Sequence, residues 1–377
     1  DGKMQTGWYA NGNKRYYSDK DGKMQTGWLV DGKDTYFLNP SGAMATGWVS
    51  DGNIWYFMDK SGKMQTGWVD TGNQRYYLDN TGKMLTGWTD IGNSRYFLAP
   101  SGAMSKGWLN ESGTWYYMDN NGKMQTGWVS DGNKRYYCDK DGKMQTGWLV
   151  DGRDTYFLSP SGSAVTGWVN DGDTWYFMDN SGKMQTGWVD SGNQRYYLDN
   201  TGKMLTGWTD VGNARYFLAP SGAVSKGWIN ENNTWYYMDN SGRMQTGWVN
   251  DRGTWYYMDN TGKMQTGWIN DGRNKYFMTD SGAMKTGWLK QDNDWYYIDG
   301  SGSIRTGWLN DGGTWYYLDG SGSMKTGFLE LDGKKYMLAD DGHLFVSITI
   351  NHQGKTYNID ANGVMTTGWI LVNNQWY

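Results

Sequence analysis

The chain has 377 residues, of which 17% are aromatic, 56 are glycine and only 4 are proline. Its 35 basic and 39 acidic residues are spread evenly, so no basic stripe is present to neutralise a nucleic-acid backbone. No apolar run approaches the roughly 18 residues that a membrane span needs. No nucleophile–base pair, metal-ligand cluster or phosphate loop suggests catalysis. The composition therefore favours a protein that is not an enzyme, with no cofactor, no metal, no nucleic-acid partner and no membrane span.

A twenty-residue period runs through the chain, and such internal repeats decide the architecture. A Gly-Trp pair recurs sixteen times without an insertion, from Trp8 to Trp308. We therefore expect regular repeats over residues 1–340. Over residues 341–377 we expect divergent repeats, in a chain cut in mid-repeat.

The repeat that contains Trp48 shows how one unit is expected to fold. A short strand begins at Trp48, Asp-Gly at 51–52 supplies a tight turn, and residues 54–58 form the return strand. Alternation places Trp55 and Tyr56 on opposite faces. Because a lone hairpin of this size is marginal in water, each must bury a face against its neighbours. The sequence predicts an all-β fold, a β-solenoid superhelix of hairpins about twenty residues long.

The residue seven places after each repeated Trp varies in a pattern. It is Trp at positions 55, 115, 175, 235, 255, 295, 315 and 376, and elsewhere it is Arg, Thr or Lys. Since core positions rarely exchange Trp for Arg, this position is predicted to lie at a surface or a cleft. Where it is Trp, two indoles of one hairpin and the first indole of the next are expected to converge. Such an aromatic box favours a quaternary ammonium ion, with cation–π attraction of roughly 0.5–2 kcal/mol per ring.

The stretch GWVSDGNIWYFMDKSGKMQTGW at residues 47–68, with its relatives along the chain, resembles the choline-binding repeats of Gram-positive surface proteins, autolysins and phage lysins. That family combines a Gly-Trp, a later Trp-Tyr-Tyr, a Gly-x-Met and another Gly-Trp. The resemblance implies a left-handed superhelix with about three hairpins per turn. It also implies choline held by two Trp of one hairpin and the Trp of the next. The implied partner is the phosphocholine of teichoic and lipoteichoic acids, and the implied location is secreted, at the bacterial cell wall.

Carried onto this chain, the resemblance implies six complete boxes: Trp48/Trp55/Trp68, Trp108/Trp115/Trp128, Trp168/Trp175/Trp188, Trp228/Trp235/Trp248, Trp248/Trp255/Trp268 and Trp288/Trp295/Trp308. A seventh, Trp308/Trp315/Phe328, is expected to be weakened by its Phe. The thioether of Met64 is expected to pack against the rings of the first box.

Repeats without the second Trp admit two interpretations. Either they decayed after duplication, or a side chain such as Arg75 or Arg95 lays its guanidinium on the neighbouring indole and fills the cation slot. After residue 340, HLFVSITINHQGKTYNID has no Trp, so no functioning box is expected there. Tyr56 and its equivalents, and the single Cys138, are expected in the core.

The predicted function is a cell-wall-binding module that holds choline at many weak sites and anchors a surface protein or lytic enzyme by avidity. Two alternatives stay open. One is a glucan-binding repeat array of an extracellular glucosyltransferase, since aromatic platforms also stack on sugar rings. The other is a structural or adhesive spacer with vestigial sites. The attached domain and the oligomeric state are left open.

Overall fold

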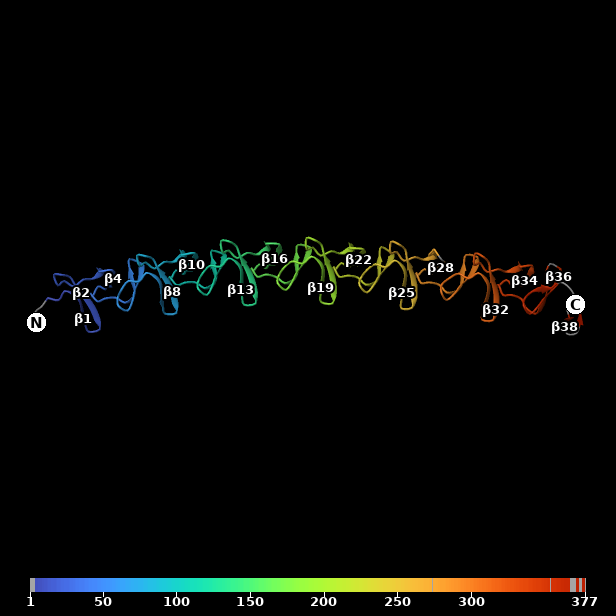
Figure 1. Cartoon of the computed structure of the whole chain (residues 1–377), viewed down its shortest axis with the longest axis horizontal. Coiled ribbons are helices and arrows are strands. Elements are labelled where there is room, and N and C mark those ends of the chain that lie inside the picture. The colour runs from blue at the N-terminus through green and yellow to red at the C-terminus, as the bar shows by residue number, and fades with distance from the viewer. Residues whose placement is uncertain (1–3, 273, 353, 367–370, 373–374, 377) are drawn as a thin grey trace. The chain divides into compact units, whose positions relative to one another are not determined.

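The computed structural model describes the chain except residues 1–3, 273, 353, 367–370, 373–374 and 377. The described part consists of strands, turns and connecting segments, with no helix among them (Figure 1). None of its segments is therefore a helix long and apolar enough to cross a membrane. Contacts divide the chain into two compact units: Asp1–Thr186 with Asn200–Lys203, and Gly187–Asp199 with Met204–Tyr377.

The strands of the first unit are β1 (Gly7–Asn11), β2 (Lys14–Ser18), β3 (Gly27–Asp31), β4 (Asp34–Leu38), β5 (Gly47–Asp51), β6 (Ile54–Met58), β7 (Gly67–Thr71), β8 (Gln74–Leu78), β9 (Gly87–Ile91), β10 (Ser94–Leu98), β11 (Gly107–Glu111), β12 (Thr114–Met118), β13 (Gly127–Asp131), β14 (Lys134–Cys138), β15 (Gly147–Asp151), β16 (Asp154–Leu158), β17 (Gly167–Asp171) and β18 (Thr174–Met178). Each odd strand pairs antiparallel with the strand that follows it.

The strands of the second unit are β19 (Gly187–Ser191), β20 (Gln194–Leu198), β21 (Gly207–Val211), β22 (Ala214–Leu218), β23 (Gly227–Glu231), β24 (Thr234–Met238), β25 (Gly247–Asp251), β26 (Thr254–Met258), β27 (Gly267–Asn270), β28 (Lys275–Met278), β29 (Gly287–Gln291), β30 (Asp294–Ile298), β31 (Gly307–Asp311), β32 (Thr314–Leu318), β33 (Gly327–Leu331), β34 (Lys334–Leu338), β35 (Ile348–His352), β36 (Lys355–Ile359), β37 (Met365–Thr366), β38 (Leu371–Val372) and β39 (Gln375–Trp376). The two-strand pattern changes after β34, where β35, β36 and β37 form a three-stranded sheet.

A tight turn closes the β5–β6 hairpin. In the β5–β6 hairpin, Asp51 pairs with Ile54, so two residues make the turn. Both of them, Gly52 at φ 56° and Asn53 at φ 68°, adopt the left-handed backbone conformation. A two-residue turn with two positive φ values matches the right-handed twist of paired strands. The Asp-Gly signal in the sequence therefore corresponds to the turn that was predicted from it.

A second turn connects successive hairpins and is held by an aspartate. Asp59 Oδ1 accepts the backbone N–H groups of Ser61 at 2.8 Å and Lys63 at 3.0 Å, and Oδ2 accepts Gln65 Nε2 at 3.1 Å. Burial raises the pKa of Asp59 while the hydrogen bonds from Ser61 and Lys63 lower it, and the net result is a pKa below the ordinary 3.8. The ionised carboxylate thus fixes the direction in which the chain enters the next hairpin.

Within a unit, a hairpin packs one face onto the hairpin before it. In β5–β6, Val49, Tyr56 and Met58 form a buried cluster against Phe37 of the preceding hairpin. The last residue of each second strand lies deepest, as in Met58, which is 0% exposed. Cys138 occupies this same position and is also 0% exposed, and its burial raises the pKa of the thiol to about 11. The predicted core roles of Tyr56 and Cys138 are confirmed.

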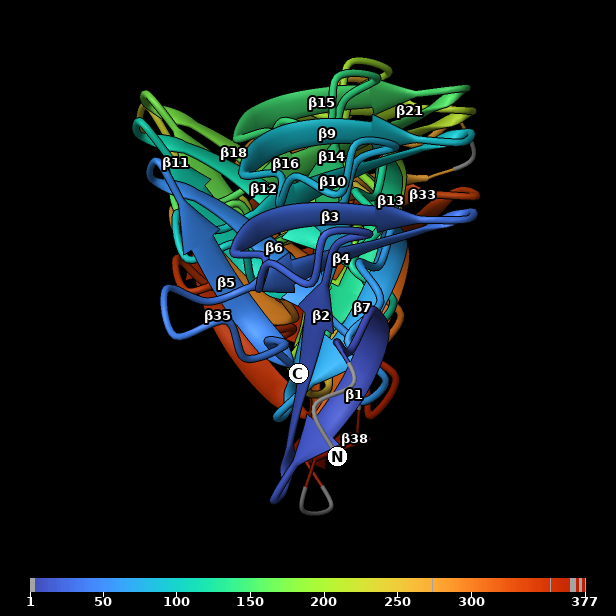
Figure 2. The same cartoon turned by 90° about the vertical axis from the view of Figure 1, so that its left-hand side faces the viewer.

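Successive hairpins of the first unit also turn about its axis. Figure 2 shows β3, β9 and β15 running in nearly the same direction, one behind another. These strands begin at Gly27, Gly87 and Gly147, so the direction recurs every third hairpin. The prediction of an all-β solenoid of hairpins is confirmed.

Candidate functional site

The β25–β26 hairpin presents two indoles on one face. Trp255 pairs with Asn250 and Trp248 pairs with Tyr257, which makes the two Trp diagonal neighbours across the strands. Their ring centroids lie 6.3 Å apart at an interplanar angle of 85°, so the rings form two perpendicular walls. Trp255 is 43% exposed, which is a large exposure for an indole. The variable seventh position thus lies at the surface, as predicted.

A tyrosine of the next hairpin supplies the third wall. The ring of Tyr276, in β28, lies 4.6 Å from that of Trp248 at an angle of 68°. Met284 follows in the connecting turn, where its backbone N–H donates to the carbonyl of Trp255 at 2.8 Å. Together these four side chains line a cavity of about 270 Å³, with Gly300 and Ser301 completing its lining.

The same arrangement recurs, and we call each copy a cage and name it by its first Trp. The Trp228 cage has Trp235, Tyr256 and Met264 around a cavity of about 270 Å³. The Trp308 cage has Trp315, Tyr336 and Leu344 around about 320 Å³. Three further cages repeat the indole pair, the Tyr contact and the Met hydrogen bond: Trp48/Trp55/Tyr76/Met84, Trp108/Trp115/Tyr136/Met144 and Trp288/Trp295/Tyr316/Met324. Trp168 and Trp175 form the same indole pair, at 6.4 Å and 83°.

The chemistry of a cage follows from its three aromatic walls. Each ring carries partial negative charge on its face, so the walls attract a cation, by roughly 0.5–2 kcal/mol for each ring in contact. The walls offer apolar contact to methyl groups, and the Met thioether adds a soft, polarisable contact. A quaternary ammonium ion suits this set because it is bulky and has no N–H group that needs an acceptor.

Seven hairpins whose seventh position is Arg or Lys hold that cation over their own first indole. The guanidinium carbon of Arg75 lies 4.7 Å from the ring centroid of Trp68, and Arg75 also pairs with the cross-strand Asp70 at 3.4 Å. The same cation–π contact is made over the indole of their own hairpins by Arg15, Arg95, Arg135, Arg195, Arg215 and Lys275. The predicted contact of the guanidinium with the neighbouring indole is therefore present for Arg75 and Arg95, and filling of the cation slot stays a prediction.

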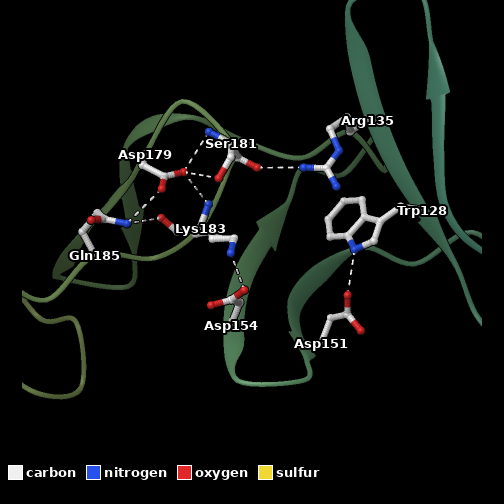
Figure 3. A network of polar contacts seen from close by, with 8 residues as sticks. All are labelled: Trp128, Arg135, Asp151, Asp154, Asp179, Ser181, Lys183 and Gln185. Atoms are coloured by element: carbon white, nitrogen blue, oxygen red, sulfur yellow. Dashed lines mark hydrogen bonds and ion pairs between the residues drawn. The ribbon is translucent and has the colours of Figure 1, made fainter.

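Arg135 shows how such a cation is fixed in place (Figure 3). Its guanidinium carbon lies 4.2 Å from the centroid of Trp128. Its Nη1 donates to the carbonyl oxygen of Ser181 at 3.0 Å, while Trp128 Nε1 donates to Asp151 Oδ2 at 2.9 Å. The arginine is thus held on both sides, and the indole is oriented by an acceptor at its edge.

Comparisons with known proteins identify the repeat. A family model described as a choline-binding repeat matches residues 5–47, 85–126, 125–166, 165–206, 185–227, 225–261 and 245–287. The chain belongs to the choline-binding repeat family. A second family model, described as a cell wall binding repeat, matches the chain at residues 46–64, 66–84, 286–304 and 306–324.

Solved structures of the family resemble this chain as well. CbpJ of Streptococcus pneumoniae is 28% identical over 90% of this chain and 99% of its own, with a TM-score of 0.37. Choline-binding protein F of Streptococcus pneumoniae is 31% identical over 80% of this chain and 98% of its own, with a TM-score of 0.37. The cell wall endolysin of phage Cp-1, complexed with choline, is 33% identical over 32% of this chain and 37% of its own, with a TM-score of 0.25. A comparison with curated protein sequences finds no match. Family membership supports binding of choline or cell wall by this chain, and a location at the cell wall or surface.

The third wall differs from the one that the sequence predicted. The expected third member at Trp248 and Trp255 was Trp268, but the cavity is lined by Tyr276 instead. Trp268 lies on the other face of its hairpin, where Lys275 sits 4.3 Å from its ring centroid. By the same geometry, Trp48 contacts Tyr76 rather than Trp68. The tyrosine expected only in the core is therefore both a core residue and a cage wall.

The predicted box of Trp108, Trp115 and Trp128 is wrong in the same way. Trp115 meets Trp108, with ring centroids 6.5 Å apart at 81°, but the third ring at Trp108 is Tyr136, at 4.7 Å. Trp128 is instead covered by Arg135 of its own hairpin. Trp115 is 43% exposed, so it forms an outer wall of an open cage rather than one side of a closed box of three indoles.

The predicted box of Trp168, Trp175 and Trp188 has members in both compact units, and it stays a prediction. Trp188 belongs to the second compact unit, where its ring lies 4.8 Å from that of Tyr216. The guanidinium carbon of Arg195 lies 4.6 Å from its ring centroid. Trp188 is therefore an indole that a cation of its own hairpin covers.

Two other predicted third members need correction within the second unit. Trp248 and Trp308 were expected to close the boxes of the preceding hairpins, but Tyr256 and Tyr316 provide the contacting rings there. Trp248 and Trp308 are instead the first indoles of cages of their own. The physical reason is common to all the boxes: the Tyr and the first Trp of a hairpin point to opposite faces, and it is the Tyr face that meets the preceding hairpin.

Met64 also lies in a different slot from the one predicted. Its backbone N–H donates to Thr35 at 2.8 Å, one hairpin earlier than the expected partners Trp48 and Trp55. In the Trp48 cage the corresponding residue is Met84, whose backbone N–H donates to Trp55 at 2.8 Å. The physical reason is that the turn after the β5–β6 hairpin, which contains Met64, reaches back to the β3–β4 hairpin, which contains Thr35.

The last cage does not depend on Phe328. The expected weakening assumed that Phe328 forms a corner, but Tyr336 holds that place at Trp308 and Trp315. Phe328 is 47% exposed and is absent from the lining of this cavity. Residues Val346, Ala361 and Asn362 of the divergent tail complete the lining instead. Of the tail's own Trp residues, Trp369 lies outside the described residues, and so does the side chain of Trp376.

Sequence reasoning missed the aspartates at the edge of the indoles. Trp228 Nε1 donates to Asp251 Oδ2 at 3.0 Å, and Trp108 Nε1 donates to Asp131 Oδ2 at 3.1 Å. In both, the acceptor is the Asp that begins the tight turn of the next hairpin, 23 residues after the Trp. The constant separation of 23 residues between Trp and Asp was the sequence signal that could have revealed this hydrogen bond.

Proposed function

We propose that this chain binds choline in its Trp–Trp–Tyr cages and thereby holds an attached protein on the choline-bearing teichoic and lipoteichoic acids of a bacterial wall. The proposed ligand residues are the indole pair of each cage, the Tyr of the next hairpin and the following Met, which is Leu344 in the Trp308 cage. The proposed role of the module is binding rather than catalysis, in a secreted protein. The regular repeats over residues 1–340 carry the function, and residues 341–377 contribute the lining of the last cage.

One observation carries the proposal: the hairpin position that holds an open cage wall in some repeats holds a cation in others. Where the position is Trp, as at Trp255, three rings enclose a cavity. Where it is Arg, as at Arg75, a guanidinium lies over the first indole. A cation of the protein therefore occupies the place that the proposal gives to choline, which supports attraction of positive charge at this position.

The number of cages on one chain compensates for the weak affinity of each cage. A cage is half open, and Trp255 stays 43% exposed, so each site is expected to bind choline weakly. Cages on one chain bind repeated phosphocholine groups of one polymer at high effective concentration. Linked weak sites of this kind exceed single-site affinity by about 10²–10⁴.

Retention on a choline-like matrix tests the proposal. The full chain is applied to a diethylaminoethyl resin, and free choline is used for elution. Elution by choline and none by dextran, together with calorimetric saturation at several choline ions per chain, is the expected result. Elution by dextran alone indicates the glucan-binding alternative. No retention and no choline heat indicate a spacer, and both outcomes contradict the proposal.

A matched pair of variants links retention to the cages. Trp255→Ala and Trp235→Ala remove exposed walls of two cages, and Val30→Ala and Val150→Ala remove side chains that are 71% and 70% exposed elsewhere. The tryptophan variant is expected to elute at lower choline concentration than the valine control. Equal elution of the two variants contradicts the assignment of the cages.

A further inference from the structure

The cages differ in whether an aspartate accepts a hydrogen bond from Nε1 at the edge of the first indole. At the Trp228 cage, Nε1 of Trp228 donates to Asp251 at 3.0 Å, and at the Trp108 cage Nε1 donates to Asp131 at 3.1 Å. The Trp248 and Trp288 cages make the same bond, to Asp271 at 3.4 Å and to Asp311 at 2.9 Å. These four carboxylates lie at the edge of the ring rather than within the cage.

Other cages have no carboxylate at this point. In the Trp48 cage the corresponding turn residue is Thr71, and in the Trp308 cage it is Leu331. The aromatic geometry is nonetheless alike, since the indole pairs at Trp48 and Trp228 are 6.4 Å and 6.3 Å apart. The cages therefore differ in charge while they share one shape.

A carboxylate at the ring edge changes the attraction of a cage for a cation in two ways. By accepting the hydrogen bond from Nε1–H, it increases the electron density of the indole, which strengthens the cation–π attraction. It also places a full negative charge about 7 Å from a cation held over the ring. Coulomb's law at an effective dielectric constant of about 40–80 makes this worth roughly three- to sevenfold in affinity. Because the group is near the surface, salt is expected to reduce the effect.

We propose that these turn aspartates are affinity-determining residues that divide the cages into two classes. The Trp108, Trp228 and Trp248 cages bind quaternary ammonium ions more tightly than the Trp48 and Trp308 cages. The Trp288 cage has opposing groups, because Lys290 lies 5.8 Å from the centroid of Trp295. The proposal rests on the proposed function and names the residues that make some choline sites tighter than others.

Asp→Asn substitution tests the proposal because the amide keeps an acceptor oxygen and removes the charge. The test variant is Asp131→Asn with Asp251→Asn, behind two open cages. The matched control is Asp31→Asn with Asp151→Asn, which make the same bond to Trp8 and Trp128 at 2.9 Å, where Arg15 and Arg135 cover the indoles. Each full-length variant is titrated calorimetrically with choline and with dimethylbutanol, a neutral isostere in which carbon replaces the nitrogen.

The expected result is a three- to sevenfold loss of choline affinity at two sites of the test variant, with no change for dimethylbutanol or in the control. The choline loss is expected to shrink as sodium chloride is raised. Unchanged choline affinity in the test variant overturns the proposal. Equal losses for choline and dimethylbutanol also overturn it, because the aspartate then only orients the indole. In both cases the wild-type chain still binds choline, whereas failure of the proposed function abolishes the wild-type signal.

A gain-of-charge variant provides an independent test. Thr71→Asp restores the usual turn residue behind the Trp48 cage. Crystals are soaked at low concentration with the bromine analogue of choline, and anomalous peaks give the occupancy of each cage. In wild type the Trp108 and Trp228 cages are expected to fill before the Trp48 cage, and Thr71→Asp is expected to remove that difference. Equal filling in wild type contradicts the proposal.

Discussion

Converting an arginine-filled position into a cage is the sharpest perturbation that the structure suggests. Trp68 already has the other components: the ring of Tyr96 lies 5.0 Å away, and the backbone N–H of Met104 donates to the carbonyl of Arg75 at 2.8 Å. Only the second indole is missing. Arg75→Trp is therefore expected to create one additional choline site per chain.

The stability of this variant is expected to stay close to that of wild type. The partly exposed Arg75–Trp68 contact contributes about 0.5–1 kcal/mol. The exposed ion pair with Asp70 contributes about 0–1 kcal/mol. Against these losses, a perpendicular indole pair contributes about 0.5–1.5 kcal/mol. The net change in the free energy of unfolding is thus expected to be within about 1.5 kcal/mol, too small to unfold the hairpin.

Calorimetric stoichiometry and a choline-analogue soak measure the outcome together. Arg75→Trp is expected to raise the number of bound choline ions by one and to add an anomalous peak at Trp68. Arg75→Lys keeps a cation over the indole and is expected to add neither. A folded Arg75→Trp variant with unchanged stoichiometry, or an added site in Arg75→Lys, refutes the reasoning.

Three further predictions concern the cage wall, the turns and the buried thiol. Tyr276→Leu is expected to weaken choline binding at the Trp248 cage by about twofold or more, as measured by calorimetry. Trp268→Phe is expected to leave that binding unchanged. If Trp268→Phe weakens binding and Tyr276→Leu does not, then Trp268 is the third wall. Asp59, Asp79, Asp179 and Asp259 have pKa values below the ordinary 3.8 in the folded chain. They therefore stabilise it above pH 3.8, and that contribution is lost as the pH falls through the lower folded pKa. The midpoint temperature of thermal unfolding is therefore expected to fall as the pH is lowered below about 4. A midpoint temperature that stays constant down to about pH 2 contradicts this role. Cys138, with its pKa raised to about 11 by burial, is expected to react with Ellman's reagent only after unfolding, and fast reaction of the folded chain contradicts its core position.

The sequence was sufficient for everything that depends on one hairpin. The Asp-Gly turn and the alternation of Trp55 and Tyr56 follow from local backbone geometry, and the structure contains both of them. The exposed seventh position was predictable too, because exchange of Trp for Arg at one site is incompatible with a closed core.

The third wall was not predictable in this way because it depends on how one hairpin rotates onto the next. Trp68 pairs with Tyr77, and Tyr76 pairs with Val69, so Trp68 and Tyr76 lie on opposite faces of the same hairpin. Alternation alone does not say which of these faces meets Trp48. The aspartates behind the indoles were missed for the same reason, since they begin the turn of the following hairpin.

A crystal structure of the chain soaked with choline tests the central claim most directly. The account predicts trimethylammonium density enclosed by Trp248, Trp255 and Tyr276, and no such density at Trp68, where Arg75 lies over the ring. Empty cages at saturating choline, or equal density at Trp68 and Trp248, would contradict it.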